Sequence, residues 1–313
     1  MKYAIISDIH GNYPAFMSVI EDAKSQAVDA YILLGDYTYR YPWANEIVED
    51  LRRLESAHII RGNGEGYLSA LRDKSKSDMT DEQSKPLYWV LHALTPKNLE
   101  YLTNLPETMA ISHDGVDIHI AHSMDLFYQP SVIEFFHTIN FNKMMMRTPI
   151  SHEEYLARGQ KALLECPVAL AEINALPKGV YLFGHNHLQF NMFYEGRYFI
   201  NPGSCGMAAD WDATAAYSIL DCAYGACTVL ERRVKYDLSI VAKELVTSSF
   251  YDYAPAWSDI IKAQLLTGKE YFGFFVNHVN ETGARLGQTT YPVSNEAWDI
   301  AVKTWDMDNL RGE

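Results

Sequence analysis

Side chains that bind metal ions occur in five short groups along the chain, and each group directly follows an apolar run typical of a β-strand. In chain order the groups are Asp8-Ile9-His10, Gly35-Asp36, Gly62-Asn63, His122 and Gly184-His185-Asn186-His187. Side chains on a strand alternate between its two faces, so Asp8 and His10 can point to the same side, as can His185 and His187. This spacing suits two ligands of one metal ion. The pattern therefore predicts a metal site built from several strand ends.

The elements that must position these groups begin with a βαβ unit. The pattern predicts a strand over residues 3–7, an amphipathic helix over 14–26 and a second strand over 30–34. Another helix and a strand at 57–60 continue this parallel layer. In open α/β sheets the ligand site lies beyond the carboxyl ends of the strands, where the first three groups are found. We therefore expect the polar side chains to gather at one edge of a sheet.

The remainder of the chain alternates helical segments with hairpins. Residues 64–106 are predicted to be mainly helical, and strands at 107–112 and 116–121 are predicted to form a hairpin. Hairpins return between residues 188 and 234. Residues 238–313 have a helical pattern and are too apolar to be disordered. Two facing sheets with helices outside them are the architecture that this order implies.

Composition limits the class of function. The chain of 313 residues is long for one ordinary domain, so we expect one catalytic domain with insertions. It carries 26 basic and 40 acidic residues, a net charge of −14, which argues against binding long nucleic acids over a basic surface. A small anionic substrate is compatible with this charge, because bound cations can reverse the local field.

The N-terminus and the cysteines favour a cytoplasmic protein. The chain starts at Met1 without a secretory signal, and no apolar run reaches membrane-spanning length. We therefore expect no contact with a membrane. No Cys-x-x-Cys pair occurs, so we expect neither a zinc knuckle nor a disulfide framework but reduced, mainly buried thiols at Cys166, Cys205, Cys222 and Cys227.

In order and spacing, the five groups resemble the calcineurin-like metallophosphoesterase superfamily, and within it the compact bacterial and archaeal phosphodiesterase branch. The resemblance extends to residues 7–12 and to the turn Asn201-Pro202-Gly203-Ser204, and it covers about residues 1–122 and 176–237. It implies an α+β fold, the four-layer αββα sandwich, over residues 1–237. We expect residues 123–175 to be a helical cap insertion and residues 238–313 to be a helical C-terminal extension packed on the same domain.

The resemblance also implies two divalent metal ions. Asp36 would bridge them, while the other ligands divide into a first site of Asp8, His10 and His187 and a second site of Asn63, His122 and His185. Mixed oxygen and imidazole ligands suit Mn²⁺, Fe²⁺ or Zn²⁺, and we expect Mn²⁺ to serve best. The implied reaction is hydrolysis of phosphodiesters or nucleotide phosphoanhydrides by attack of a metal-bridging hydroxide on phosphorus, with Asp36, Asn63 and His122 in the catalytic centre.

Two alternatives stay open at this point. One is a phosphoprotein phosphatase, and the other is a non-catalytic, protein-binding scaffold of the same fold, like the retromer subunit. A scaffold could lose metal ligands without penalty, yet all seven are present, which favours the enzyme. The substrate is expected to be a small phosphorylated molecule, with a nucleotide as one candidate. The sequence predicts no oligomeric state.

The chain departs from the superfamily after Asn63. Many members continue with a histidine thought to help the leaving group depart, but here the residues are Gly64 and Glu65. General acid catalysis is typically worth 10²–10⁴-fold, so good leaving groups such as phosphates of anhydrides or aryl alcohols are favoured. We hypothesise that Gly64→His gains most on poor leaving groups.

A second departure follows the bridging aspartate, where residues 37–43 contain four aromatic residues and one arginine. The segment is either a packed loop or a wall on which a nucleobase stacks while Arg40 touches a phosphate. The second interpretation makes Tyr39, Arg40 and Tyr41 substrate-binding residues. The insertion, which contains Met144-Met145-Met146, either acts as a cap that selects substrates by size or extends the fold.

Overall fold

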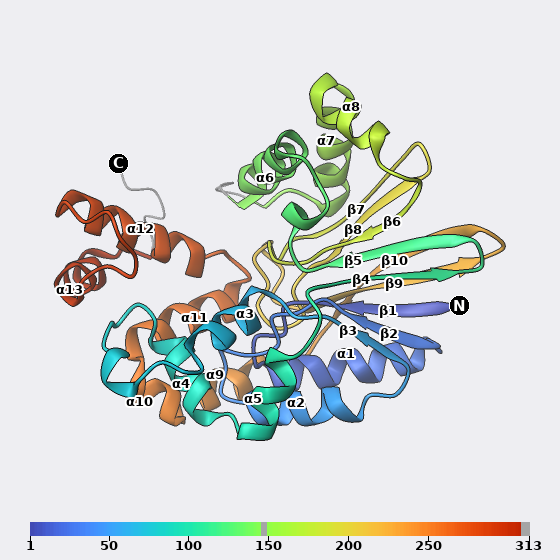
Figure 1. The fold of residues 1–313 in the computed structure, drawn as a ribbon. Coiled ribbons are helices and arrows are strands. Elements are labelled where there is room, and N and C mark those ends of the chain that lie inside the picture. Colours follow the sequence, from blue (N-terminus) through green and yellow to red (C-terminus); the bar gives the residue numbers. More distant parts are fainter. Residues whose placement is uncertain (145–148, 308–313) are drawn as a thin grey trace.

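The computed structural model describes residues 1–144 and 149–307. Two five-stranded sheets face each other, and helices cover their outer faces (Figure 1). The first sheet has the order β10-β9-β1-β2-β3, with β1 (Lys2–Ile6), β2 (Ala30–Leu33), β3 (Ala57–Ile59), β9 (Ala215–Ala223) and β10 (Ala226–Val234). The second has the order β4-β5-β6-β8-β7, with β4 (Thr108–His113), β5 (Val116–Ala121), β6 (Gly179–Leu182), β7 (Gln189–Tyr194) and β8 (Arg197–Pro202).

Parallel pairing brings the strand ends of each sheet to one edge. In the first sheet β1, β2 and β3 are parallel neighbours, joined by the crossover helices α1 (Tyr13–Ser25) and α2 (Ala44–Arg53). In the second sheet β5, β6 and β8 are parallel neighbours. The carboxyl ends of β1, β2 and β5, which precede ligand residues, therefore end at the same side of the molecule.

The two sheets are held together by an apolar layer between them. Alternate residues of each central strand point inward, because side chains on a strand alternate between its faces. The layer includes Ile5 and Ile32 from the first sheet and Ile118, Leu182 and Ile200 from the second, all of them without solvent exposure. Each of these side chains contributes about 1.5–3 kcal/mol by its burial. The frame beneath the strand ends is therefore rigid.

Helices form the two outer layers. The first sheet is covered by α1 and α2 and by helices that follow β3, namely α3 (Asn63–Leu71), α4 (Lys85–Ala93) and α5 (Pro96–Thr103), with a short 3₁₀ turn over Lys76–Asp78. The second sheet is covered by α6 (Pro130–Met144), α7 (His152–Leu164) and α8 (Pro167–Ala175), which follow a 3₁₀ turn over Met124–Leu126. The predicted αββα sandwich is confirmed.

The insertion is helical, as predicted, and its helices pack on the face of the second sheet. Phe136 of α6 contacts Phe183, Phe190 and Phe199 of that sheet at ring-centroid distances of 5.5–5.9 Å. The described helices of the insertion, α6, α7 and α8, therefore extend the fold as its fourth layer. Met145 and Met146 lie outside the described residues. The role of the insertion in selecting substrates stays a prediction.

The C-terminal segment is helical, as predicted. It contains α9 (Leu238–Thr247), α10 (Ser249–Tyr253), α11 (Pro255–Thr267), α12 (Phe272–Arg285) and α13 (Asn295–Thr304). These helices share an apolar cluster that includes Trp257, Phe275 and Trp298, and Tyr41 of the loop after β2 belongs to the same cluster. Figure 1 shows them at the end of the molecule opposite the N-terminus. Strand β1 starts at the N-terminus and runs toward this end. The extension thus lies on the side where the ligand-bearing loops emerge, while the predicted domain boundaries stay a prediction.

The cysteine prediction is wrong for one pair. Cys222 of β9 and Cys227 of β10 form a disulfide, whereas Cys166 and Cys205 are free. The two paired residues lie directly opposite each other in the antiparallel ladder, with Cα atoms 4.3 Å apart, on either side of the turn at Tyr224-Gly225. Hairpin register, not a short cysteine motif, brings them together. In the described part of the chain, no helix has the length and apolar character needed to cross a membrane.

Candidate metal centre

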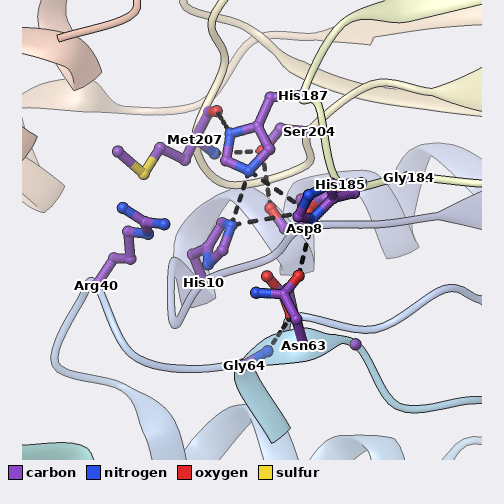
Figure 2. A network of polar contacts seen from close by, with 12 residues as sticks. Asp8, His10, Arg40, Asn63, Gly64, Gly184, His185, His187, Ser204 and Met207 are labelled. Carbon is purple, nitrogen blue, oxygen red and sulfur yellow. Dashed lines mark hydrogen bonds and ion pairs between the residues drawn. The ribbon is translucent and has the colours of Figure 1, made fainter. Parts of the chain in front are cut away.

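All seven predicted ligands come together at the shared edge of the two sheets. Figure 2 labels five of them, namely Asp8, His10, Asn63, His185 and His187. Asp8 and His10 follow β1, Asp36 follows β2, and Asn63 begins α3 after β3. From the second sheet come His122, directly after β5, and the loop between β6 and β7 that carries His185 and His187. Five loops from two sheets therefore supply one cluster.

The first group consists of Asp8, His10 and His187. Asp8 Oδ1 lies 3.8 Å from His10 Nε2 and 3.4 Å from His187 Nε2, and the two Nε2 atoms are 3.0 Å apart. Asp8 and His10 have no solvent exposure. One carboxylate oxygen and two imidazole nitrogens thus face a common point, which matches the ligand types of the predicted first site.

The second group lies beside the first. His122 Nε2 is 3.7 Å from Asp36 Oδ2 and 4.0 Å from Asp8 Oδ1. Asn63 Oδ1 is 3.0 Å from His122 Nε2 and 2.8 Å from His185 Nδ1. In this structure Asp8 Oδ1 lies near ligand atoms of both groups, and the bridging role of Asp36 stays a prediction.

Backbone carbonyls set the orientation of two imidazoles. His122 Nδ1 donates to Leu34 O at 2.8 Å, and His187 Nδ1 donates to Met207 O at 2.7 Å, since a carbonyl can only accept. The Nε2 atom of each neutral ring therefore presents a lone pair. His122 Nε2 faces Asn63 Oδ1, which is also an acceptor. Such carbonyl contacts are the usual second sphere of metal-binding histidines.

The buried polar atoms of the cluster fit a divalent cation. Among the described residues, Asp8 Oδ1 is buried without a hydrogen-bond partner, and it faces the Nε2 atoms of His10 and His187. A buried carboxylate oxygen without a partner is costly. A cation at each group would satisfy the carboxylate, imidazole and amide oxygen atoms together.

Electrostatics within the cluster are dominated by burial and by the close approach of opposite charges. Burial alone would raise the pKa of Asp8, but His187, His122 and His10 outweigh it and hold that pKa well below its usual range. Burial opposes the charged form of His122, yet Asp36 and Asp8 outweigh it and raise the pKa of that ring. Burial and then the positive charge of Arg40 lower the pKa of His10 well below its ordinary value. Asp8 is therefore held in its ionised form.

The backbone of the ligand loops is unusual. Five of the seven ligands adopt positive φ angles between 53° and 73°, namely Asp8, His10, Asp36, His185 and His187. This left-handed conformation costs of order 1–3 kcal/mol for residues other than glycine and is concentrated at functional sites. Contacts from other loops hold it in place.

The Asn-Pro-Gly-Ser turn supplies some of these contacts. Ser204 Oγ donates to Asp8 O at 2.8 Å, and Gly206 N donates to the same carbonyl at 3.0 Å. On the other side of Asp8, a Cβ atom at Gly184 would lie 2.0 Å from Ser7 Oγ and 2.7 Å from Asp8 Oδ2, so only glycine allows this approach. The turn and the glycine together fix the Asp8 carboxylate.

Glu65 is a residue of the site that the motif comparison did not bring out. Its side chain has no solvent exposure and accepts three backbone N–H groups, from Asp36, Tyr37 and Gly62, each at 2.9 Å. It thereby ties the loop after β2 to the start of α3, which carries Asn63. Burial and then the nearby Asp36 raise the pKa of Glu65 to about 7. A glutamate three residues after the helix N-cap is the sequence signal that could have identified it.

Glu65→Gln is expected to destabilise the fold and weaken metal binding. An amide can accept with its oxygen only, so its NH₂ group would face a buried backbone N–H, and an unsatisfied buried donor costs about 1–3 kcal/mol. Denaturant unfolding and metal content measure the two effects. Glu21→Gln, on the exposed face of α1, is the control and should match the wild type. Equal stability and metal content for Glu65→Gln would show that the contacts to Glu65 do not position the ligands.

Residues 37–41 of the aromatic loop are all buried to different degrees, with Tyr39 8% and Arg40 7% exposed. Tyr37 and Tyr41 have no solvent exposure, and Tyr37 Oη donates to Ile60 O at 2.6 Å, which fits the packed-loop interpretation for both. Tyr39 and Arg40 lie closer to the metal centre, since the Tyr39 ring is 5.6 Å from that of His10. Substrate binding by Tyr39, Arg40 and Tyr41 stays a prediction, and the burial of Tyr41 favours the other two.

The Tyr39 ring occupies the space that a side chain at position 64 would need. A Cβ atom at Gly64 would lie 2.9 Å from Tyr39 Cε1 and 3.0 Å from Asp36 Oδ1. The backbone N–H of Gly64 donates to the same Asp36 oxygen at 2.7 Å. The two departures from the superfamily pattern are therefore one structural feature, because a tyrosine at 39 and a histidine at 64 compete for one place.

Comparisons with known proteins agree with this geometry. A family model described as the calcineurin-like phosphoesterase superfamily domain matches residues 1–225. A Methanocaldococcus jannaschii protein described as uncharacterized is 23% identical over 270 residues, 81% of this chain and 94% of its own.

Two solved structures share the fold. A metallophosphoesterase from Sphaerobacter thermophilus has a TM-score of 0.59 at 23% identity and covers 86% of this chain and 100% of its own. A protein from Pyrococcus horikoshii described as hypothetical has a TM-score of 0.56 at 17% identity and covers 83% of this chain and 97% of its own. Because the family model spans well over half of the sequence, the chain belongs to the calcineurin-like phosphoesterase superfamily.

Proposed function

We propose that this protein is a phosphoester hydrolase that binds two divalent ions and acts on phosphodiesters or nucleotide phosphoanhydrides. The observation that carries the proposal is the convergence of seven ligand side chains around Asp8 Oδ1, a buried carboxylate oxygen without a hydrogen-bond partner among the described residues. Family membership supports the reaction class.

The ions would supply the Lewis-acid chemistry. The chemistry that two divalent ions would supply, with Mn²⁺ the first choice and Fe²⁺ or Zn²⁺ as alternatives, is to lower the pKa of a water and to offset charge on the phosphoryl oxygens. Asp36, Asn63 and His122 would hold one ion in the catalytic centre. Arg40 is the nearby cation of the loop after β2, and we assign it to an oxygen of the substrate phosphate.

The substrate is proposed to be a small phosphorylated molecule with a good leaving group. Gly64 offers no side chain to protonate a departing oxygen, and Tyr39 fills the adjacent space. A phosphate or nucleotide that leaves from an anhydride needs less help, because its pKa is roughly 6. The net charge of −14 disfavours a long nucleic acid, and we propose a cytoplasmic location.

Turnover of bis(p-nitrophenyl) phosphate, together with the metal content of the purified protein, tests the proposal. We expect about two equivalents of divalent metal per chain and hydrolysis that depends on them. A protein that binds metal but hydrolyses neither this ester nor a dinucleoside polyphosphate would be a scaffold. Release of phosphate from phosphopeptides in preference to diesters would instead favour the phosphoprotein phosphatase.

The leaving-group argument leads to a double-variant prediction. Gly64→His alone should impair the site, because the new side chain meets Tyr39 and Asp36. In Tyr39→Gly the space is free, and adding Gly64→His should raise hydrolysis of a diester with an alkyl leaving group by about tenfold or more, within the range of general acid catalysis. Rates for alkyl and aryl diesters are compared in all four proteins. A gain that is equal for both leaving groups would contradict the argument.

A further inference from the structure

Arg40 is a buried cation that forms no salt bridge with any residue that the structure describes. Its side chain is 7% exposed, and Nη2 donates to Tyr39 Oη at 3.1 Å. Nε and Nη1 are buried without a hydrogen-bond partner, again among described residues. A guanidinium is always charged and carries five N–H donors, so leaving most of them unpaired away from water is costly. The arrangement favours a ligand that brings a negative charge.

The guanidinium lies within electrostatic range of the metal centre. Arg40 is four residues after Asp36, and Tyr39, its hydrogen-bond partner, has its ring edge-on to His10. Arg40 Cζ lies 4.8 Å from the centre of the Tyr39 ring, and the Tyr39 ring lies 5.6 Å from that of His10. Figure 2 shows the Arg40 side chain beside His10. An anion bound at the metal ligands would therefore also meet Arg40.

An aromatic ring from the C-terminal extension holds the guanidinium from its other side. Arg40 Cζ lies 3.3 Å from the centre of the Phe272 ring, at the first residue of α12. The Phe272 ring stacks in turn on Trp257 of α11, with centroids 4.8 Å apart and an interplanar angle of 27°. Trp257 is 2% exposed. A guanidinium over an aromatic face is a favourable cation–π arrangement, so the stack fixes where Arg40 points.

A buried glutamine fixes the position of Phe272 and connects it to the ligand loops. Gln264 Oε1 accepts the backbone N–H groups of Tyr271 and Phe272 at 3.1 and 2.9 Å. Its Nε2 atom donates to Ala208 O at 3.1 Å. Ala208 follows Met207, whose carbonyl accepts from His187 Nδ1. The extension therefore reaches the metal centre by two routes.

We propose that the C-terminal extension completes the active site, with Phe272 as a positioning residue that holds Arg40 where it binds an anionic oxygen of the substrate phosphate. The inference rests on the proposed function and deepens it, because it assigns a substrate-binding task to a segment outside the 1–225 family match. The planar, forked guanidinium suits a phosphoryl group, to which it can donate two parallel hydrogen bonds.

Phe272→Leu tests the inference, since leucine keeps an apolar side chain but removes the aromatic face. Phe275→Leu is the matched control, because Phe275 lies in the same helix and packs on Trp257 and Trp298 without a contact to Arg40. In the metal-loaded protein we expect Phe272→Leu to raise KM for bis(p-nitrophenyl) phosphate and the inhibition constant of inorganic phosphate by about 3- to 30-fold. Metal content should not change, and Phe272→Tyr should restore both constants.

A double-mutant cycle with Arg40→Gln separates positioning from general packing. If Phe272 acts through Arg40, Phe272→Leu should add little to the KM of Arg40→Gln. Full additivity, or equal effects of Phe272→Leu and Phe275→Leu, would overturn the inference. If Phe272→Leu does not fold, Phe272→Tyr and Arg40→Gln still test the inference. An Arg40→Gln variant with the KM of the wild type would contradict the assignment of Arg40 to the substrate phosphate. A wild-type protein without turnover would instead refute the proposed function itself.

Discussion

Asp36→Asn is expected to remove bound metal and to lower turnover by more than about 10²-fold. Asp36 Oδ1 accepts the backbone N–H of Gly64, so an asparagine would place its oxygen there and turn its NH₂ group toward His122 and the cation site. Donor hydrogens repel a cation. Even outer-sphere partners of metal ligands are typically worth 10–100-fold, so the loss of a ligand should exceed that range.

Metal analysis and the rate of bis(p-nitrophenyl) phosphate hydrolysis measure this effect. Asp73→Asn is the control, since that side chain is 89% exposed and is not one of the ligands. It should retain both metal and activity. Retention of two metal equivalents and near-normal turnover by Asp36→Asn would exclude this carboxylate from the centre.

Removal of metal is expected to abolish turnover and to destabilise the fold. Ions that bind only the folded chain stabilise it by about 2.7 kcal/mol at a concentration of 100 times Kd. In the metal-free site Asp8 Oδ1 has no hydrogen-bond partner among the described residues, and the carboxylates of Asp8 and Asp36 lie close together without a cation between them. Thermal or denaturant unfolding with a chelator or with Mn²⁺ measures the difference.

Asp36→Asn provides the control for this effect, because a protein unable to bind the ions should unfold at the same point under both conditions. Mn²⁺, Fe²⁺ and Zn²⁺ are then returned in turn to the metal-free wild type, and turnover is measured for each. Activity that persists after complete metal removal would contradict the proposed chemistry.

The frame of the site was predictable because it depends on local patterns. Apolar runs predict strands, and the polar residues that follow them must emerge where those strands end. Asp8 and His10, or His185 and His187, are two residues apart in sequence, so their proximity was predictable even though they lie in loops beyond the strand ends and not on the strands themselves. The order of β and α segments then predicted two sheets with outer helices, since few topologies satisfy it.

Contacts between distant segments were not predictable in this way. No sequence pattern indicates that the Tyr39 ring fills the space beside Gly64, because the two residues lie on separate loops. The stack of Arg40 on Phe272 joins residues more than 200 positions apart. The Cys222–Cys227 disulfide depended on hairpin register, which cysteine spacing alone did not reveal. Periodicity describes which face of an element is buried, not which segment covers it.

The left-handed backbone of the ligand loops also depends on contacts between segments that are distant in sequence. Asp8, His10 and His187 adopt positive φ because hydrogen bonds from other loops hold them there, such as His10 N to Asp36 O at 2.9 Å. A glycine at these positions would indicate a left-handed conformation in the sequence. Glycine has no side chain to bind a metal ion, however, so ligand residues occupy them instead. The strain is therefore compatible with function and invisible to residue patterns.

Anomalous diffraction at the manganese absorption edge, from crystals grown with Mn²⁺, tests the central claim most directly. The account predicts two peaks about 3.5–4 Å apart. One should lie among Asp8, His10 and His187 and the other among Asn63, His122 and His185, with Asp36 between them. The absence of any peak among these seven side chains, or a peak bound only elsewhere on the molecule, would contradict it.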